Sequence, residues 1–532
     1  MFHARRAYIS MRTKLFLFFL IIIGFFYRLY GLDANYSFWT DEEHVAIFSR
    51  AILERGKPVL ANGYSTGIYQ WLQYWASAVS AKIFGLNEFA IRLPSVFFGV
   101  LTIWAVYLLA KELFVNSSTS AVRRQRLCRR REESLRLRPA PSGAGLHSGP
   151  PSEVFVPLVA AALTTFLNIE ILWSRQARPY QALQFFYLLG AWFIYKLTKE
   201  EKFNWRYFLG FFAIGILASL MHGLGLVILF SGFIYLLLFS FSLVKKWLPL
   251  GILIGLLLSY IFRLSPSMFT TQLGKINNLF YYRVFLWHNY LLLVFLALFG
   301  SLSLIFRKRK EWLIIILPLV VQGIFVSFFW RQPFIRYFYV VFPFFILLAS
   351  LGLVKIVEFG KKLGGWRNIG IWGLLCLLVS FQVFGVRKIV LIPQKTYSLN
   401  EDMQEIPEVD WKKIYNFVGE KLKKSPGSIL ITNWNDLPVW FLGEGKLNYL
   451  IRENELDIDV VSGAKYLNSL EKLIFLMNKE PEGYLVVDSW DDAVPEGVRE
   501  YCHKNLRREL EVDRLYPIQP RYWTVWVYSW GI

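Results

Sequence analysis

The chain has 532 residues, of which 55% are hydrophobic and 18% aromatic, with a mean hydropathy of +0.39. This composition excludes an ordinary soluble protein built around one core and indicates a polytopic membrane protein. The formal net charge is +21, but most Lys and Arg residues form short clusters between apolar runs, which is typical of cytoplasmic loops and not of nucleic-acid binding. The three cysteines lie far apart, so neither a disulfide framework nor a Cys-rich metal site is predicted.

A membrane-spanning helix needs about 20 apolar residues, and this rule predicts about 11 spans within residues 1–390. The apolar run Phe208–Phe241 is divided into two short spans because Met221-His222-Gly223 interrupts it. The first span follows basic residues as a signal peptide would, but no small-residue cleavage site follows it, so an uncleaved span is expected. The other predicted spans are Leu15–Leu32, Phe89–Leu113, Val154–Trp173, Gln181–Leu197, Leu248–Leu264, Val284–Phe306, Trp312–Trp330, Tyr337–Val357 and Ile369–Val386.

The positions of the basic residues predict the orientation of these spans. With the N-terminus in the cytoplasm, every second loop is basic, as the positive-inside rule requires. The chain is then an integral protein of the plasma membrane whose C-terminal residues lie outside the cytoplasm. Four arginines fall in outer loops against this trend, which indicates another role for them: Arg175, Arg178, Arg331 and Arg336.

An outer segment at residues 33–88 separates the first two spans and is expected to contain two helices. The first runs from Thr40 to Glu54, where Thr40 and Glu43 have the spacing of a capping box. The second, Gly67–Phe84, has a Trp-rich apolar stripe and is expected to lie flat in the membrane interface.

Residues 116–152 differ in composition from the rest of the chain. They are rich in Arg and contain no Lys, Phe, Tyr or Trp. Two interpretations remain open: a long cytoplasmic loop that contacts lipid, or a shift of the reading frame that is restored near Val154.

Residues 391–532 have the composition of a soluble domain. Helices are expected at Trp411–Lys423 and Asp436–Leu442, and strands at Ser428–Thr432, Tyr484–Asp488 and Arg521–Tyr528. This alternation predicts a small extracytoplasmic α/β domain. No Gly-rich phosphate loop begins any of its helices, so nucleotide binding is not predicted.

Asp41-Glu42-Glu43 is the one run of three consecutive carboxylates in the chain, and it directly follows the first span. Acidic residues in the first turn of a helix interact favourably with the helix dipole, which is the simpler explanation. A cap needs no more than Thr40 and Glu43, however, and the remaining carboxylates have the chemistry of a general base next to the membrane.

The chain resembles the dolichyl-phosphate-mannose protein mannosyltransferase superfamily, which includes the aminoarabinose transferases of lipid A. The resemblance covers residues 14 to 390 except 116–152. The residues that carry it are Trp39-Thr40-Asp41-Glu42, the stretch Phe84 to Ser95 with Arg92-Leu93-Pro94-Ser95, the run Trp173 to Tyr180, and Arg336-Tyr337 with Pro343.

Members of this superfamily are GT-C fold enzymes that transfer a sugar from a polyprenyl phosphate to an acceptor on the outer face. The resemblance implies that Asp41 is the catalytic base and Glu42 its neighbour. Arginine suits the charge that develops on the leaving phosphate, and Arg178 and Arg336 are the first candidates for this role, before Arg175. One displacement without a covalent intermediate would invert the anomeric centre.

The further candidates for substrate binding are Tyr180, Arg92 and His222, each with a structural alternative. Outer arginines can anchor a span end or bind phospholipid, Arg92 can fix a helix end, and His222 can be a hydrogen-bonded structural residue. No cofactor is firmly implied. A divalent metal is compatible with the sequence but unsupported, because no second His lies in reach of His44.

The expected partners are a polyprenyl-phosphate sugar, a protein, lipid or glycan acceptor, and membrane lipid, without nucleic acid. Two other classes of function stay open. A flippase or transporter of lipid-linked sugars predicts internal repeats and broken spans, and a non-catalytic scaffold that presents the C-terminal domain predicts that Asp41 is dispensable.

Overall fold

The computed structural model describes residues 2–531 except 34–36, 39–40, 69, 117–151, 201–202, 240–273, 275, 307, 364, 398–407, 455 and 516–522. The predicted span Leu248–Leu264 and almost all of the segment 116–152 therefore lie outside the described residues.

The chain forms two compact units. The helical unit comprises Met1–Arg28, Val96–Ser174 and Pro179–Pro393, and the mixed unit comprises Leu29–Ser95, Arg175–Arg178 and Gln394–Ile532. This grouping differs from the predicted division near residue 390, because the outer segment 33–88 packs with the C-terminal residues.

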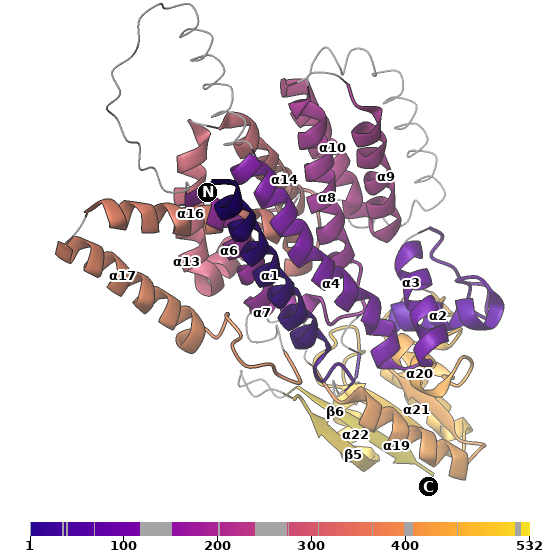
Figure 1. The fold of residues 1–532 in the computed structure, drawn as a ribbon. Coiled ribbons are helices and arrows are strands. Elements are labelled where there is room, and N and C mark those ends of the chain that lie inside the picture. Colours follow the sequence, from indigo (N-terminus) through magenta and orange to yellow (C-terminus); the bar gives the residue numbers. More distant parts are fainter. Residues whose placement is uncertain are drawn as a thin grey trace, which may run out of the picture. The chain divides into compact units, whose positions relative to one another are not determined.

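The helical unit consists of apolar helices, in agreement with the predicted class. Its helices α8, α9 and α10 lie side by side (Figure 1). Among the described residues, four helical stretches are long and apolar enough to cross a membrane, at Glu88–Asn116, Leu279–Ile305, Arg309–Phe328 and Phe342–Lys362. The elements are α1 (Phe2–Leu29), α4 (Glu88–Ala110, which begins in the mixed unit), η1 (Lys111–Asn116), η2 (Ser152–Phe155), α6 (Val156–Phe166), α7 (Asn168–Trp173), α8 (Tyr180–Lys199), α9 (Trp205–Met221), η3 (Gly223–Gly225), α10 (Leu226–Phe239), α13 (Leu279–Ile305), α14 (Arg309–Phe328), α15 (Ile335–Tyr339), α16 (Phe342–Leu363), α17 (Gly365–Ser380) and η4 (Phe381–Gly385).

Breaks divide several of the predicted spans. The predicted interruption at His222 is confirmed, since His222 is extended between α9 and η3. The predicted span Val154–Trp173 is also broken, at Leu167, where the Asn168 amide donates to the Lys388 carbonyl over 2.8 Å. The Val390 amide donates to the Phe166 carbonyl, also over 2.8 Å. Residues 388–390 thus satisfy backbone groups that would otherwise be unpaired in an apolar environment.

Helices α13 and α16 approach each other closely at two glycines. A Cβ atom on Gly300 would lie 2.1 Å from the Leu348 carbonyl oxygen, and one on Gly352 would lie 1.9 Å from the Leu296 carbonyl oxygen. Any larger residue would push the helices apart, so small residues set this contact, as is usual between membrane helices.

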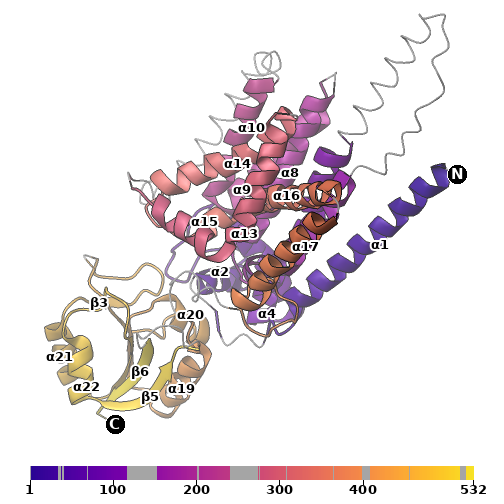
Figure 2. The ribbon, with the colours of Figure 1, turned by 90° about the vertical axis from the view of Figure 1, so that its left-hand side faces the viewer.

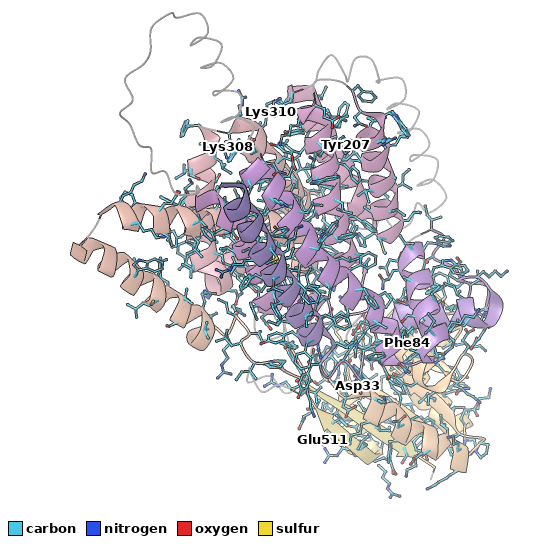
Figure 3. All side chains as sticks on the ribbon, viewed as in Figure 1. Asp33, Phe84, Tyr207, Lys308, Lys310 and Glu511 are labelled. Carbon is cyan, nitrogen blue, oxygen red and sulfur yellow. The ribbon has the colours of Figure 1, made fainter. Side chains whose placement is uncertain are left out.

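Figure 3 shows Lys308 and Lys310 at the same end of the helical unit as Tyr207. Tyr207 lies in the first turns of α9, directly after the basic segment at Lys196, Lys199 and Lys202, and Lys308 and Lys310 lie at the start of α14. Two loops that were both predicted to be cytoplasmic therefore lie at one end of this unit.

The mixed unit combines the outer helices α2 (Glu42–Arg55) and α3 (Trp71–Phe84) with a six-stranded sheet of order β3-β2-β1-β4-β6-β5. The predicted C-terminal sheet is confirmed, with strands β1 to β4 parallel and β6 antiparallel to both β4 and β5. Helices α19 and α20 cover one face of the sheet, and α21 and α22 cover the other (Figure 2). The elements are α19 (Trp411–Lys424), β1 (Ile429–Thr432), α20 (Asp436–Leu442), β2 (Tyr449–Ile451), β3 (Lys465–Leu467), α21 (Leu470–Lys479), β4 (Gly483–Asp488), α22 (Val498–Asn505), β5 (Arg507–Asp513) and β6 (Thr524–Trp530).

Helix α2 is held against α20 inside the mixed unit. Phe48 and Ile52 of α2 share an apolar cluster with Val439 and Trp440 of α20. The Arg50 guanidinium donates to the Val439 and Trp440 carbonyls over 3.1 and 2.7 Å and lies on the Trp440 ring. The C-terminal domain therefore fixes the helix whose first turn carries the acidic run.

Candidate functional site

Asp41 occupies the N-cap position of α2 without a side-chain capping hydrogen bond. The predicted capping partner Thr40 lies outside the described residues. The Asp41 side chain is 56% exposed and its Oδ2 lies 3.6 Å from Nη1 of Arg178, whose side chain is 1% exposed. An exposed carboxylate thus lies beside a buried guanidinium.

Glu42 has the opposite environment. It is fully buried, and its two oxygens accept hydrogen bonds from Nε and Nη2 of Arg92, both over 2.9 Å. The backbone amide of Ala177 donates to the same carboxylate over 2.6 Å, and Arg92 also donates to the Ser37 carbonyl. Glu42 and Arg92 therefore join α2, the start of α4 and the segment Arg175–Arg178. This arrangement fits a supporting role better than contact with substrate.

Arg175 is also engaged by the protein. Its guanidinium donates to the carbonyls of Tyr30, Gly31 and Lys395 over 2.6, 3.1 and 2.6 Å. It also lies 5.0 Å from the centroid of the Tyr397 ring. These contacts use the planar donors that a phosphate would need, which argues against Arg175 as a phosphate ligand.

Further titratable groups surround the first turn of α2. Burial raises the pKa of Glu43 well above its usual value, and the charge of Asp436 adds to this effect. Burial also raises the pKa of Asp436 to about 6, with a smaller contribution from the charge of Asp41. Burial lowers the pKa of His44 to about 4, although the charge of Asp41 opposes this. At neutral pH, His44 is therefore uncharged.

The remaining predicted residues lie in the helical unit and form a second cluster. The Tyr180 ring is 5.5 Å from His222 and 6.0 Å from Tyr337. The Arg336 guanidinium lies 4.0 Å from the Phe334 ring and 5.3 Å from the Tyr337 ring. Nδ1 of His222 accepts from the Leu224 amide over 3.1 Å, which supports the structural alternative for this His.

Sequence reasoning missed Asp436 and Glu170. Asp436 begins α20 and contributes to the charge around α2, but no local pattern connects positions so far apart in sequence. Glu170 could have been singled out from the sequence, because a carboxylate inside a predicted span is rare and is usually paired with another polar group. Among the described residues, no group of three or more His, Cys, Asp or Glu side chains could hold a metal ion.

The comparisons with known proteins address the fold and the family. Over residues 71–123 the chain matches the family model described as dolichyl-phosphate-mannose-protein mannosyltransferase. The structure is similar to that of ArnT from Cupriavidus metallidurans in the apo state, with 14% identity, a TM-score of 0.58 and 98% of each chain covered. The family model thus supports the predicted resemblance over residues 71–123, and the structural likeness concerns the fold.

A second structure of ArnT from the same organism, bound to undecaprenyl phosphate, has 13% identity and a TM-score of 0.56, again over 98% of each chain. At these identities the likeness establishes an ArnT-like fold. No curated protein matches the chain. The residues matched by the family model include Arg92 and end inside the compositionally unusual segment, and Asp41 lies outside them.

Proposed function

We propose that the chain is a membrane glycosyltransferase that moves a sugar from a polyprenyl-phosphate donor to an acceptor hydroxyl on the outer face. The observation that carries the proposal is the exposed Asp41 carboxylate held beside the buried Arg178 guanidinium. The family match and the ArnT-like fold support it, and one ArnT structure is bound to undecaprenyl phosphate.

In the proposed reaction, Asp41 accepts the proton of the acceptor hydroxyl while its oxygen attacks the anomeric carbon. The bond from that carbon to the phosphate oxygen breaks, and the lipid phosphate leaves with an additional negative charge. Arg178 and Arg336 stabilise this charge, because a fixed guanidinium binds phosphate oxygens through parallel hydrogen bonds. A single displacement inverts the anomeric centre.

The proposed enzyme has about 11 spans, as the apolar runs predict. Its N-terminus is cytoplasmic, and the mixed unit, with Asp41, lies outside the plasma membrane. Arg92 and Glu42 support the segment that carries Arg178, and Tyr180 contacts the donor. His222 has the structural role that its hydrogen bond with the Leu224 amide supports. The acceptor is a protein, lipid or glycan.

The test is transfer by membranes that contain the Asp41→Asn variant, supplied with a panel of polyprenyl-phosphate sugars. We expect release of lipid phosphate to be lost, at least a hundredfold, while membrane insertion is unchanged. Asp33→Asn is the matched control, since it replaces another exposed Asp of the mixed unit. Full activity of Asp41→Asn would refute the proposed base.

A transporter of lipid-linked sugars is the second candidate, and the breaks at Leu167 and His222 are the observation that favours it. Reconstituted vesicles distinguish the two functions. If the protein is a transporter, the Asp41→Asn variant still moves the lipid-linked sugar across the bilayer. Neither the wild-type protein nor the variant then releases lipid phosphate.

A further inference from the structure

Glu170 is a carboxylate enclosed in the helical unit. It lies in α7 and is fully buried. A carboxylate inside an apolar helical unit costs free energy unless other groups satisfy it, and such residues usually have a function. The proposed reaction does not use it.

Helix α8 and the short helix α15 satisfy this carboxylate. Nε2 of Gln184 donates to its Oε1 over 3.1 Å. The single proton of the Tyr339 hydroxyl is shared between Oε2 of Glu170, 3.1 Å away, and Oε1 of Gln181, 2.5 Å away. Arg28 of α1, also fully buried, supplies positive charge that attracts Glu170.

Helix α15 depends on these contacts because it has five residues, too few to be stable alone. Side chains from neighbouring helices hold its backbone. Nε2 of Gln184 donates to the Tyr339 carbonyl over 3.1 Å, and Nε2 of Gln322 in α14 donates to the Tyr337 carbonyl over 2.8 Å. The contact of the Tyr339 hydroxyl with Glu170 also connects α15 to α7.

Arg336 lies three residues before Tyr339, which is about one turn of the same helix. Its side chain is buried between the Phe334 and Tyr337 rings. A rotation of α15 would therefore redirect the guanidinium, and the Tyr339 anchor opposes such a rotation.

We infer that Glu170 is a positioning residue that sets the direction of Arg336 through Tyr339. The inference rests on the proposed function, in which Arg336 binds the lipid phosphate. A role confined to stability would lower the resistance to unfolding without changing phosphate affinity in the folded protein, so affinity is the decisive measurement.

The experiment measures binding of undecaprenyl phosphate to the full chain in lipid nanodiscs. We expect Glu170→Gln and Tyr339→Phe each to weaken binding by about tenfold, the effect of disturbing a charge-assisted contact. Tyr339→Phe keeps the ring that stacks on Trp173, so it tests the hydroxyl even if Glu170→Gln fails to fold. The Km for donor rises while kcat changes less.

The matched control is Glu112→Gln. Glu112 is also buried and bridges to Lys196 and Lys199 over 3.1 and 2.7 Å, but these partners lie at the other end of α8 from Gln181 and Gln184. We expect this variant to lose stability and to keep its affinity for undecaprenyl phosphate.

A double-mutant cycle completes the test. If Glu170 acts through Arg336, adding Glu170→Gln to Arg336→Ala weakens binding no further. Additive effects, or wild-type affinity in both single variants Glu170→Gln and Tyr339→Phe, would overturn the inference. The two proposals fail in different measurements: retained transfer by Asp41→Asn refutes the proposed base, whereas unchanged affinity for undecaprenyl phosphate in Glu170→Gln and Tyr339→Phe refutes the positioning role.

Discussion

Asp41 and Glu42 are adjacent in sequence, yet the structure exposes one carboxylate and encloses the other between Arg92 and the Ala177 amide. Successive side chains on a helix point about 100° apart. Asp41 therefore faces solvent, Glu42 faces the buried Arg92, and Glu43 is buried. The sequence indicated that this run carries chemistry. It could not show which carboxylate points outward, because the partner of Glu42 lies 50 residues away.

Glu42→Gln is expected to destabilise the protein by about 3 kcal/mol, because it leaves the buried Arg92 guanidinium without its counter-charge. Thermal unfolding of the purified variant measures this. Glu43→Gln is the control on the next residue. Burial raises the pKa of Glu43, and its replacement leaves the pair of Glu42 and Arg92 in place, so this amide should cost much less. Equal losses in the two variants would contradict the assigned role of the Arg92 pair.

Glu408 gives the mixed unit a pH dependence. Burial raises its pKa to about 8, with Arg92 opposing the increase and Glu42 adding to it. The folded state then binds a proton that the unfolded state releases above about pH 4.5. The contribution of this group to stability is therefore complete below pH 4.5 and is lost as the pH rises towards 8. Wild-type protein should melt several degrees lower at pH 8.5 than at pH 6.5, and Glu408→Gln should reduce this difference.

Helices and strands were predictable where their own residues determine them. The apolar runs predicted α8, α13 and α14 closely, and the buried strands β1 and β4 were found from their apolar residues. The break at Leu167 was missed, because Phe166-Leu167-Asn168 contains neither Pro nor Gly and residues 388–390 provide its hydrogen bonds. Strands β2 and β3 were missed because each has three residues, and β5 because it is largely exposed.

The contact between α13 and α16 can be tested by substitution of its glycines. Gly352→Ala should lower the melting temperature of the helical unit, since its Cβ would lie 1.9 Å from the Leu296 carbonyl oxygen. Gly373→Ala in α17 is the control, because nothing lies within 4 Å of the added atom and Ala favours a helix by about 1 kcal/mol. A neutral Gly352→Ala would show that the two helices can separate without cost.

At the scale of the whole molecule, composition was sufficient to predict apolar helices followed by an α/β domain. It was not sufficient to predict that Leu29–Ser95, Arg175–Arg178 and the C-terminal residues form one unit. Four residues between two helices, at positions 175–178, carry no local pattern that assigns them to a distant domain. Their membership follows from buried bonds such as Ala177 to Glu42.

The proposed orientation of the membrane can be tested by cysteine labelling of intact cells. In a background in which Cys128, Cys376 and Cys502 are replaced, Asp33→Cys should react with a membrane-impermeant maleimide. Lys308→Cys should react only after the membrane is permeabilised. The reverse pattern would invert the proposed topology and place Asp41 in the cytoplasm.

The discontinuous origin of the mixed unit affects the order of events during biosynthesis. Asp41 is synthesised nearly 400 residues before α20, which packs against its helix. The acidic run therefore cannot reach its final surroundings until α20 has been synthesised. A chain that stops before α20 would leave the apolar face of α2 without the residues that cover it.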